Sequence, residues 1–192
     1  MQEKLDLKSM SFAQVRALCD SLGFPAFRAG QIFAWCGRGI TAFSEMTDLN
    51  KADRAALQAK TCLTPCKIAE KFVSTLDGTA KYLIELQNGY TVEAVVMRYR
   101  YGLSACLSTQ AGCRMGCAFC ASTVNGLGRN LSAGEILDQY LLLSKDQGER
   151  IGSVVLMGMG EPLDNYDNVC RFLRLLREED GVNIGLRNVS LS

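Results

Sequence analysis

The sequence predicts an α/β protein in which a small helical domain and a β-meander precede the start of a parallel α/β sheet or barrel. Three observations support this fold class. Apolar residues recur at helical spacing up to about residue 60, strand-like runs follow, and from residue 103 strands and helices alternate. We therefore divide the chain into residues 1–66, residues 67–101 and residues 102–192.

The amino-terminal region carries signals for three short helices. Ser11 is a suitable N-cap for a helix that begins at Phe12. The apolar residues of 27–36 are spaced for a second helix, and Gly37 and Gly39 end it. A third helix is predicted for residues 53–60. Short helical bundles of this kind are common accessory modules, although core packing explains each apolar residue by itself.

The middle region reads as a small meander of three strands. Asp77-Gly78 and Asn88-Gly89 are typical turn dipeptides. They separate three strand-like runs, which are residues 71–76, 81–86 and 90–97.

The carboxy-terminal region alternates between strands and helices. Ser132 and Glu135 form a capping-box pattern at the start of one helix, and Asp164 is placed to cap the next. The buried-type strands of this region are residues 103–107, 151–157 and 188–192. The order β-α-β-α-β predicts the beginning of a parallel sheet or barrel.

Composition restricts the chemistry that the chain can perform. It has 192 residues, nine cysteines, no histidine and a formal net charge of +1. The lack of histidine excludes Ser-His-Asp and Cys-His catalytic pairs and histidine-bound metals. The near-neutral charge does not by itself indicate nucleic-acid binding. A polar amino terminus and an odd cysteine count favour the cytoplasm, where clustered cysteines indicate metal or redox chemistry.

The strongest chemical signal is a C-x3-C-x2-C triplet formed by Cys113, Cys117 and Cys120. Three thiolates on a compact loop can bind three irons of a [4Fe-4S] cluster and leave the fourth iron open to a small molecule. The alternatives are a cysteine-rich zinc site, for which a regularly placed fourth ligand is lacking, and buried thiols without function.

This triplet, with an aromatic residue before its last cysteine, resembles the signature of radical S-adenosylmethionine enzymes. The surrounding sequence resembles the RlmN/Cfr family, whose members methylate adenine in 23S rRNA. The resemblance covers nearly the whole chain from about Phe12. It is carried by the segments 27–32, 43–49, 106–120, 126–131, 157–163 and 167–169.

The resemblance implies a role for each matching residue. Cys113, Cys117 and Cys120 would bind the cluster, whose open iron chelates S-adenosylmethionine. The remaining matches are Gly160 and Glu161 for the methionine part of this cofactor, Ser192 as a further cofactor contact, Cys106 as the thiol that resolves a covalent enzyme–RNA intermediate, and Glu93 as proton acceptor. A turn, a frayed terminus, a buried thiol and a surface carboxylate are the plainer interpretations of these positions.

The resemblance also implies a fold, partners and a difference from the family. It implies that residues 102–192 are the first half of a radical SAM partial (β/α) barrel. It predicts carbon-2 methylation of an adenine in 23S rRNA, and of tRNA as a further substrate, with a flavodoxin or ferredoxin as reductant and an RNA-facing helical domain. Family members continue well beyond the point that matches Ser192. We therefore expect a truncated chain that lacks the methyl-carrying cysteine, the partner with which Cys106 would form a disulfide. The alternative functions are a non-catalytic RNA-binding or assembly fragment and an iron–sulfur electron carrier.

Overall fold

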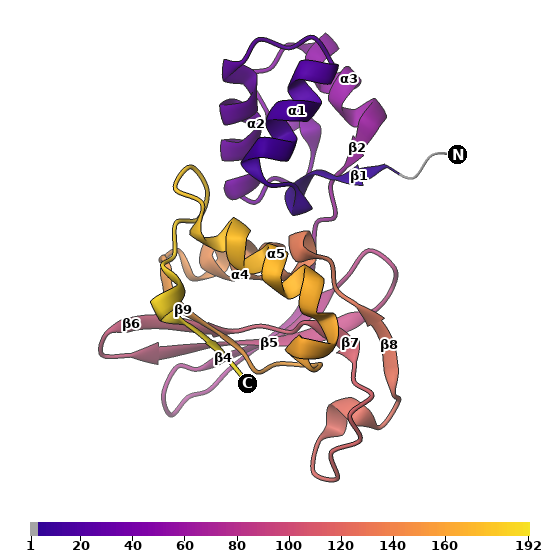
Figure 1. Cartoon of the computed structure of the whole chain (residues 1–192). Helices are drawn as coiled ribbons and strands as arrows, with labels where there is room; N and C mark the ends of the chain where they lie inside the picture. Colours follow the sequence, from indigo (N-terminus) through magenta and orange to yellow (C-terminus); the bar gives the residue numbers. More distant parts are fainter. Residues whose placement is uncertain (1–3) are drawn as a thin grey trace.

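The helical domain occupies one end of the molecule. The computed structural model describes residues 4–192, and Figure 1 shows the helices of this domain stacked above the rest of the chain. They are α1 (Phe12–Ser21), α2 (Phe27–Gly37) and α3 (Lys51–Lys60), and the short strands β1 (Leu5–Asp6) and β2 (Thr61–Cys62) pair beneath them. Ser11 caps α1 in a capping box with Gln14, so the predicted start of this helix is confirmed.

One six-stranded sheet joins the other two predicted regions. Its strand order is β10-β9-β6-β5-β4-β3. The meander strands pair antiparallel, and β5 continues the ladder onto β6 through the pair Val95–Cys106. The division that we drew between residues 101 and 102 therefore falls inside a continuous sheet. The strands are β3 (Lys67–Val73), β4 (Ala80–Glu85), β5 (Thr91–Tyr99), β6 (Gly102–Cys106), β9 (Ile151–Leu156) and β10 (Val189–Leu191).

The parallel half follows the predicted β-α-β-α-β order. Strands β6, β9 and β10 are parallel, with α4 (Ala133–Gln147) and α5 (Tyr166–Arg177) between them in sequence. Ser132 and Glu135 form the expected capping box of α4. The expectation for Asp164 is wrong, because Asn165 occupies the N-cap of α5 and the Asp164 carboxylate binds an arginine instead.

The two faces of the sheet differ in what covers them. Both α4 and α5 lie on the same face (Figure 1), and that face is lined by buried apolar side chains, including Ala94, Ala105 and Val154. Tyr82 belongs to it as well, and its hydroxyl donates to Asp146 of α4 at 2.6 Å. The opposite face is not covered by any helix of residues 4–192.

The helical domain is attached to the start and middle of α4. Lys8, which is 1% exposed, forms a buried ion pair with Asp138. The second carboxylate oxygen of Asp138 accepts from the Cys66 backbone N–H at 2.6 Å. One turn earlier, the Ser9 hydroxyl accepts from the Gly134 backbone N–H at 2.7 Å. Because these groups are buried, their pairing requires the two domains to keep this arrangement.

Candidate cofactor site

The cysteine triplet lies on a loop that projects from a two-stranded ribbon (Figure 1). The ribbon consists of β7 (Gln110–Gly112) and β8 (Leu127–Asn130), which pair antiparallel on either side of the loop. The sequence did not indicate this ribbon, since β7 has only three residues. It closes the loop at its base, where the Cys113 backbone N–H donates to Gly126 O at 3.0 Å.

Two glycines allow the loop to fold tightly around its cysteines. Gly112 has φ +79°, and a Cβ atom there would lie 2.1 Å from Gly126 O, so no larger residue fits. Gly116 has φ +71° inside the motif. The loop then turns back through a hydrogen bond of 3.0 Å from Cys120 N–H to Cys117 O. These contacts hold the backbone, and they leave the thiols of the triplet without hydrogen bonds to the described residues.

The donor set fits an iron–sulfur cluster better than a single metal ion. Within residues 4–192, no group of three or more Cys, Asp or Glu side chains converges on one point as a single ion would require. In a cluster each thiolate binds a different iron, so the sulfurs do not have to converge. Soft thiolates on a glycine-rich loop are the ligands that iron–sulfur clusters use. Cys113 is 6% exposed, whereas Cys117 lies at the surface.

Strand β9 ends in a turn that is bound tightly to the segment after β6. The Thr109 backbone N–H donates to Met159 O at 2.9 Å, and the Glu161 N–H donates to the Gln110 side chain at 2.8 Å. Gly160 has φ +99°, and a Cβ atom there would lie 2.5 Å from the Gln110 Cβ. This position therefore requires glycine, and the turn places Gly160 and Glu161 against the residues that lead directly into the cysteine loop.

A charged contact ties the same turn to the cysteine motif itself. Arg114, the residue after Cys113, donates through Nε to both carboxylate oxygens of Asp164, at 2.9 and 3.1 Å. Gln110 donates to the same carboxylate at 2.9 Å. The Arg114 guanidinium, followed by the Gln110 bond, holds the pKa of Asp164 below its usual range. We call this set, Gln110, Arg114 and Asp164, the clasp.

The sequence did not predict the clasp, since it placed Asp164 only as a helix cap and gave no role to the buried polar residues before Cys113. Ser108, Thr109 and Gln110 are all at most 1% exposed although they are polar. The Gln139 side chain of α4 bonds both backbone groups of Ser108, at 3.0 Å each. The only signal in the sequence was the polar run before Cys113, and such a run is also typical of a surface loop.

Cys106 and Glu93 lie on the uncovered face of the sheet. Cys106 pairs with Val95 of β5 and with Val155 of β9, and Glu93 is two residues from Val95 on the same face. The Glu93 carboxylate forms an ion pair with Lys81 at 2.7 Å, and both side chains are half-exposed. The structure thus brings these two predicted residues onto one surface.

The protein surroundings of Cys106 do not lower the pKa of its thiol. Within the protein itself, burial raises the pKa of Cys106, and a hydrogen bond from the Met157 backbone opposes this only in part. The described residues place no cationic side chain against this thiol.

The predicted residues share one edge of the sheet. Cys106 ends β6, Gly160 follows β9, and Ser192 lies one residue beyond β10, where it is exposed. Because the three strands are parallel, these positions lie at their carboxyl ends, where α/β folds bind ligands.

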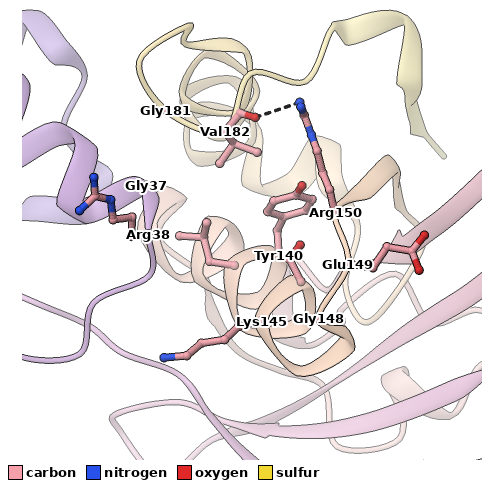
Figure 2. A pocket seen from close by; sticks show the side chains of 11 residues that line it. Gly37, Arg38, Tyr140, Lys145, Gly148, Glu149, Arg150, Gly181 and Val182 are labelled. Carbon is pink, nitrogen blue, oxygen red and sulfur yellow. Dashed lines mark hydrogen bonds between the residues drawn. The ribbon is translucent and has the colours of Figure 1, made fainter.

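A cavity of about 470 Å³ lies away from this edge. Figure 2 shows it between the end of α2, the end of α4 and the Gly181-Val182 segment, with Arg38, Lys145 and Arg150 around it. None of the predicted site residues lines it. This cavity is a feature of the junction between the domains and is separate from the candidate cofactor site.

Two family models match separate parts of the chain. The ribosomal RNA large subunit methyltransferase N-terminal domain matches residues 5–63, and the radical SAM superfamily matches residues 107–192. A probable dual-specificity RNA methyltransferase RlmN from Alkaliphilus oremlandii is 49% identical over 190 residues, and one from Alkaliphilus metalliredigens is 50% identical. The chain is similar to RlmN proteins along nearly its whole length. Each of these alignments covers 99% of this chain.

A solved structure has the same fold. The chain matches a radical SAM methyltransferase from Sphaerobacter thermophilus with a TM-score of 0.88 and 37% identity, over 97% of this chain and 56% of that one. The partial-barrel fold expected from the sequence is thereby confirmed. The chain spans about half the length of the curated relatives that it matches, 55% and 54% for the two Alkaliphilus proteins. In the described part of the chain, no helix is both long and apolar enough to cross a membrane.

Proposed function

We propose that this chain provides the cofactor site and the resolving thiol of an RNA methyltransferase of the RlmN type, which acts on carbon 2 of an adenine in 23S rRNA and also on tRNA. The observation that carries this proposal is the clasp. It joins the cysteine loop to the turn after β9, two segments that lie 50 residues apart in sequence. A protein that used a cluster only for electron transfer would have no use for a turn held this firmly against the cysteine loop.

Each side of the clasp has a binding task. Cys113, Cys117 and Cys120 would hold a [4Fe-4S] cluster as thiolates, and S-adenosylmethionine would bind its open iron. When bound, this pair supplies a 5′-deoxyadenosyl radical. Glu161 accepts a hydrogen bond from Leu163 N–H at 3.0 Å through one carboxylate oxygen. Its other oxygen and the Gly160 carbonyl remain for the ammonium group of the cofactor, and Ser192 adds a hydroxyl at the same edge.

The uncovered face has a separate task. We assign Cys106 as the thiol that attacks the sulfur of a methyl-carrying cysteine and so frees the RNA, with a disulfide as the product. Cys106 forms no disulfide in this structure. Glu93 is the proposed proton acceptor, and Lys81 fixes the direction of its carboxylate. The electron would come from a flavodoxin or ferredoxin, and the compartment would be the cytoplasm.

The test separates cofactor chemistry from methyl transfer. The chain is reconstituted with iron and sulfide without oxygen, mixed with S-adenosylmethionine and dithionite, and assayed for 5′-deoxyadenosine by chromatography. We expect bound iron and cofactor cleavage from the wild-type chain. Cys117→Ala should abolish both, whereas the matched control Cys62→Ala should retain both because Cys62 lies in β2 of the helical domain. Methyl transfer to 23S rRNA is then measured in a separate assay.

The outcomes distinguish the alternatives. Bound zinc in protein purified without oxygen would overturn the cluster assignment. A reducible cluster with no cofactor cleavage would point to an iron–sulfur electron carrier. If the chain forms no cluster and cleaves no cofactor, the remaining interpretation is an RNA-binding or assembly module. Arg114→Ala adds a test of the clasp itself, since we expect it to weaken cofactor cleavage about 10-fold while the bound iron remains.

A further inference from the structure

The turn between β5 and β6 carries an exposed pair of stacked tyrosines. The rings of Tyr99 and Tyr101 lie 5.0 Å apart and within 6° of parallel. Tyr99 is 45% exposed and Tyr101 is 76% exposed. The Tyr99 hydroxyl contacts Met97 Sδ at 3.4 Å, which fixes the inner ring against the sheet. The outer face of Tyr101 therefore presents an aromatic surface that the chain has already oriented.

Arginines alternate with these tyrosines, in the order Arg98-Tyr99-Arg100-Tyr101. The Arg98 guanidinium is held by Glu149 at 3.0 Å. Arg100 is exposed, and its guanidinium makes no hydrogen bond or ion pair with any residue between 4 and 192. The turn thus carries one unpaired positive charge on the residue that precedes the open aromatic face of Tyr101.

We propose that this turn is a second contact for single-stranded RNA, in which a base stacks on Tyr101 and the adjoining phosphate pairs with Arg100. Stacking on an aromatic ring accepts any base, and an arginine beside it supplies the phosphate contact. An apolar protein partner would not use the free guanidinium, and an acidic peptide would not use the bare ring. The choice of RNA rests on the proposed function.

The position of the turn makes this contact distinct from the cofactor site. The turn precedes β6, whereas the cysteine loop follows it, so the two lie at opposite ends of the sheet (Figure 1). A strand of five residues such as β6 spans about 17 Å. RNA bound at the cofactor edge can therefore extend along the molecule to reach the turn, which would then add affinity without touching the reacting base.

The experiment measures RNA binding by the full chain without iron or S-adenosylmethionine. A fluorescein-labelled oligoadenylate of about 12 nucleotides is titrated by anisotropy over a range of salt concentrations. Tyr101→Leu should raise the Kd about 10-fold, while Tyr101→Phe, which keeps the ring, should stay within about 2-fold. Arg100→Ser should reduce the slope of log Kd against log salt by about 0.7. Arg171→Ser, an exposed arginine of α5, is the matched charge control and should leave the slope unchanged.

A base analogue tests the stacking directly. With 2-aminopurine in the oligonucleotide, we expect quenching on binding that is lost in Tyr101→Leu and retained in Tyr101→Phe. The proposal is overturned if Tyr101→Leu binds and quenches like wild type, or if an RNA duplex binds as tightly as the single strand. Because no cofactor is present, this result is independent of cofactor cleavage. If the chain cleaves S-adenosylmethionine but its RNA binding does not depend on Tyr101, the RNA contact at the turn is refuted and the proposed function stands.

Discussion

The two faces of the six-stranded sheet are built for different purposes. On the covered face, apolar side chains from β4, β5, β6 and β9 are buried against α4 and α5. On the uncovered face, Glu93, Lys81 and Cys106 share a surface that no helix of residues 4–192 occupies. Successive side chains of a strand point to opposite faces of the sheet. This alternation alone separates the residues that stabilise the fold from the candidate chemical residues. Four measurements test this difference between the two faces.

The largest effect should come from the buried ion pair between Lys8 and Asp138 of α4. Asp138→Ala leaves the Lys8 ammonium, whose side chain is 0% exposed, without its partner. We expect a loss of about 3–5 kcal/mol in the free energy of unfolding. Urea denaturation followed by circular dichroism measures it. Glu149→Ala removes a half-exposed pair with Arg98, two residues beyond the end of α4, and should cost at most about 1 kcal/mol. Equal losses in the two variants would refute the expected difference between the buried and the exposed ion pair.

Leu156, the last residue of β9, and Met157, the residue after it, compare a buried position with an exposed one. Leu156 is 0% exposed on the covered face, and Met157 is 54% exposed. Leu156→Ala should lower the free energy of unfolding by about 3 kcal/mol because it leaves a cavity under the helices. Met157→Ala, a truncation of similar size, should change it by about 0.5 kcal/mol or less. A large loss from Met157→Ala would contradict the difference between the two positions.

Thiol reactivity should rank the cysteines by their surroundings. Burial raises the pKa of Cys106 and raises that of Cys36 to about 12. A raised pKa means less thiolate, so at about pH 8 iodoacetamide should modify exposed Cys117 first, Cys106 about 10-fold more slowly and Cys36 last. Peptide mass spectrometry at successive times gives the rates. The rate at Cys106 should still rise between about pH 8 and pH 10. Modification of Cys106 before Cys117 would show that this thiol is activated in the protein alone.

The smallest effect should come from the ion pair on the uncovered face. Lys81 and Glu93 are about half-exposed, at 50% and 49%. Lys81→Met should therefore change the free energy of unfolding by less than about 1 kcal/mol in the same denaturation assay. A loss above about 2 kcal/mol would assign this pair to the framework of the sheet and would weaken its proposed role in directing Glu93.

Much of the local structure could be predicted because short-range patterns encode it. Apolar spacing located α2, and the Ser132–Glu135 pattern located the start of α4, since a capping box depends on residues only three apart. The cap predicted at Asp164 failed for the opposite reason. A charge-assisted bond to Arg114, 50 residues earlier, outcompeted the local one.

The sequence by itself determined the chemistry available to this protein: three thiols at cluster spacing, a further cysteine before them and no imidazole. It also indicated the β-α-β-α-β order. Only the tertiary structure decided that the meander and the parallel strands form one sheet, that Gln110, Arg114 and Asp164 clasp the turn after β9 to the cysteine loop, and that Glu93 and Cys106 share the uncovered face. The physical reason is range. Periodicity and capping act within a few residues, whereas strand pairing and buried ion pairs join segments whose meeting depends on the whole packed core.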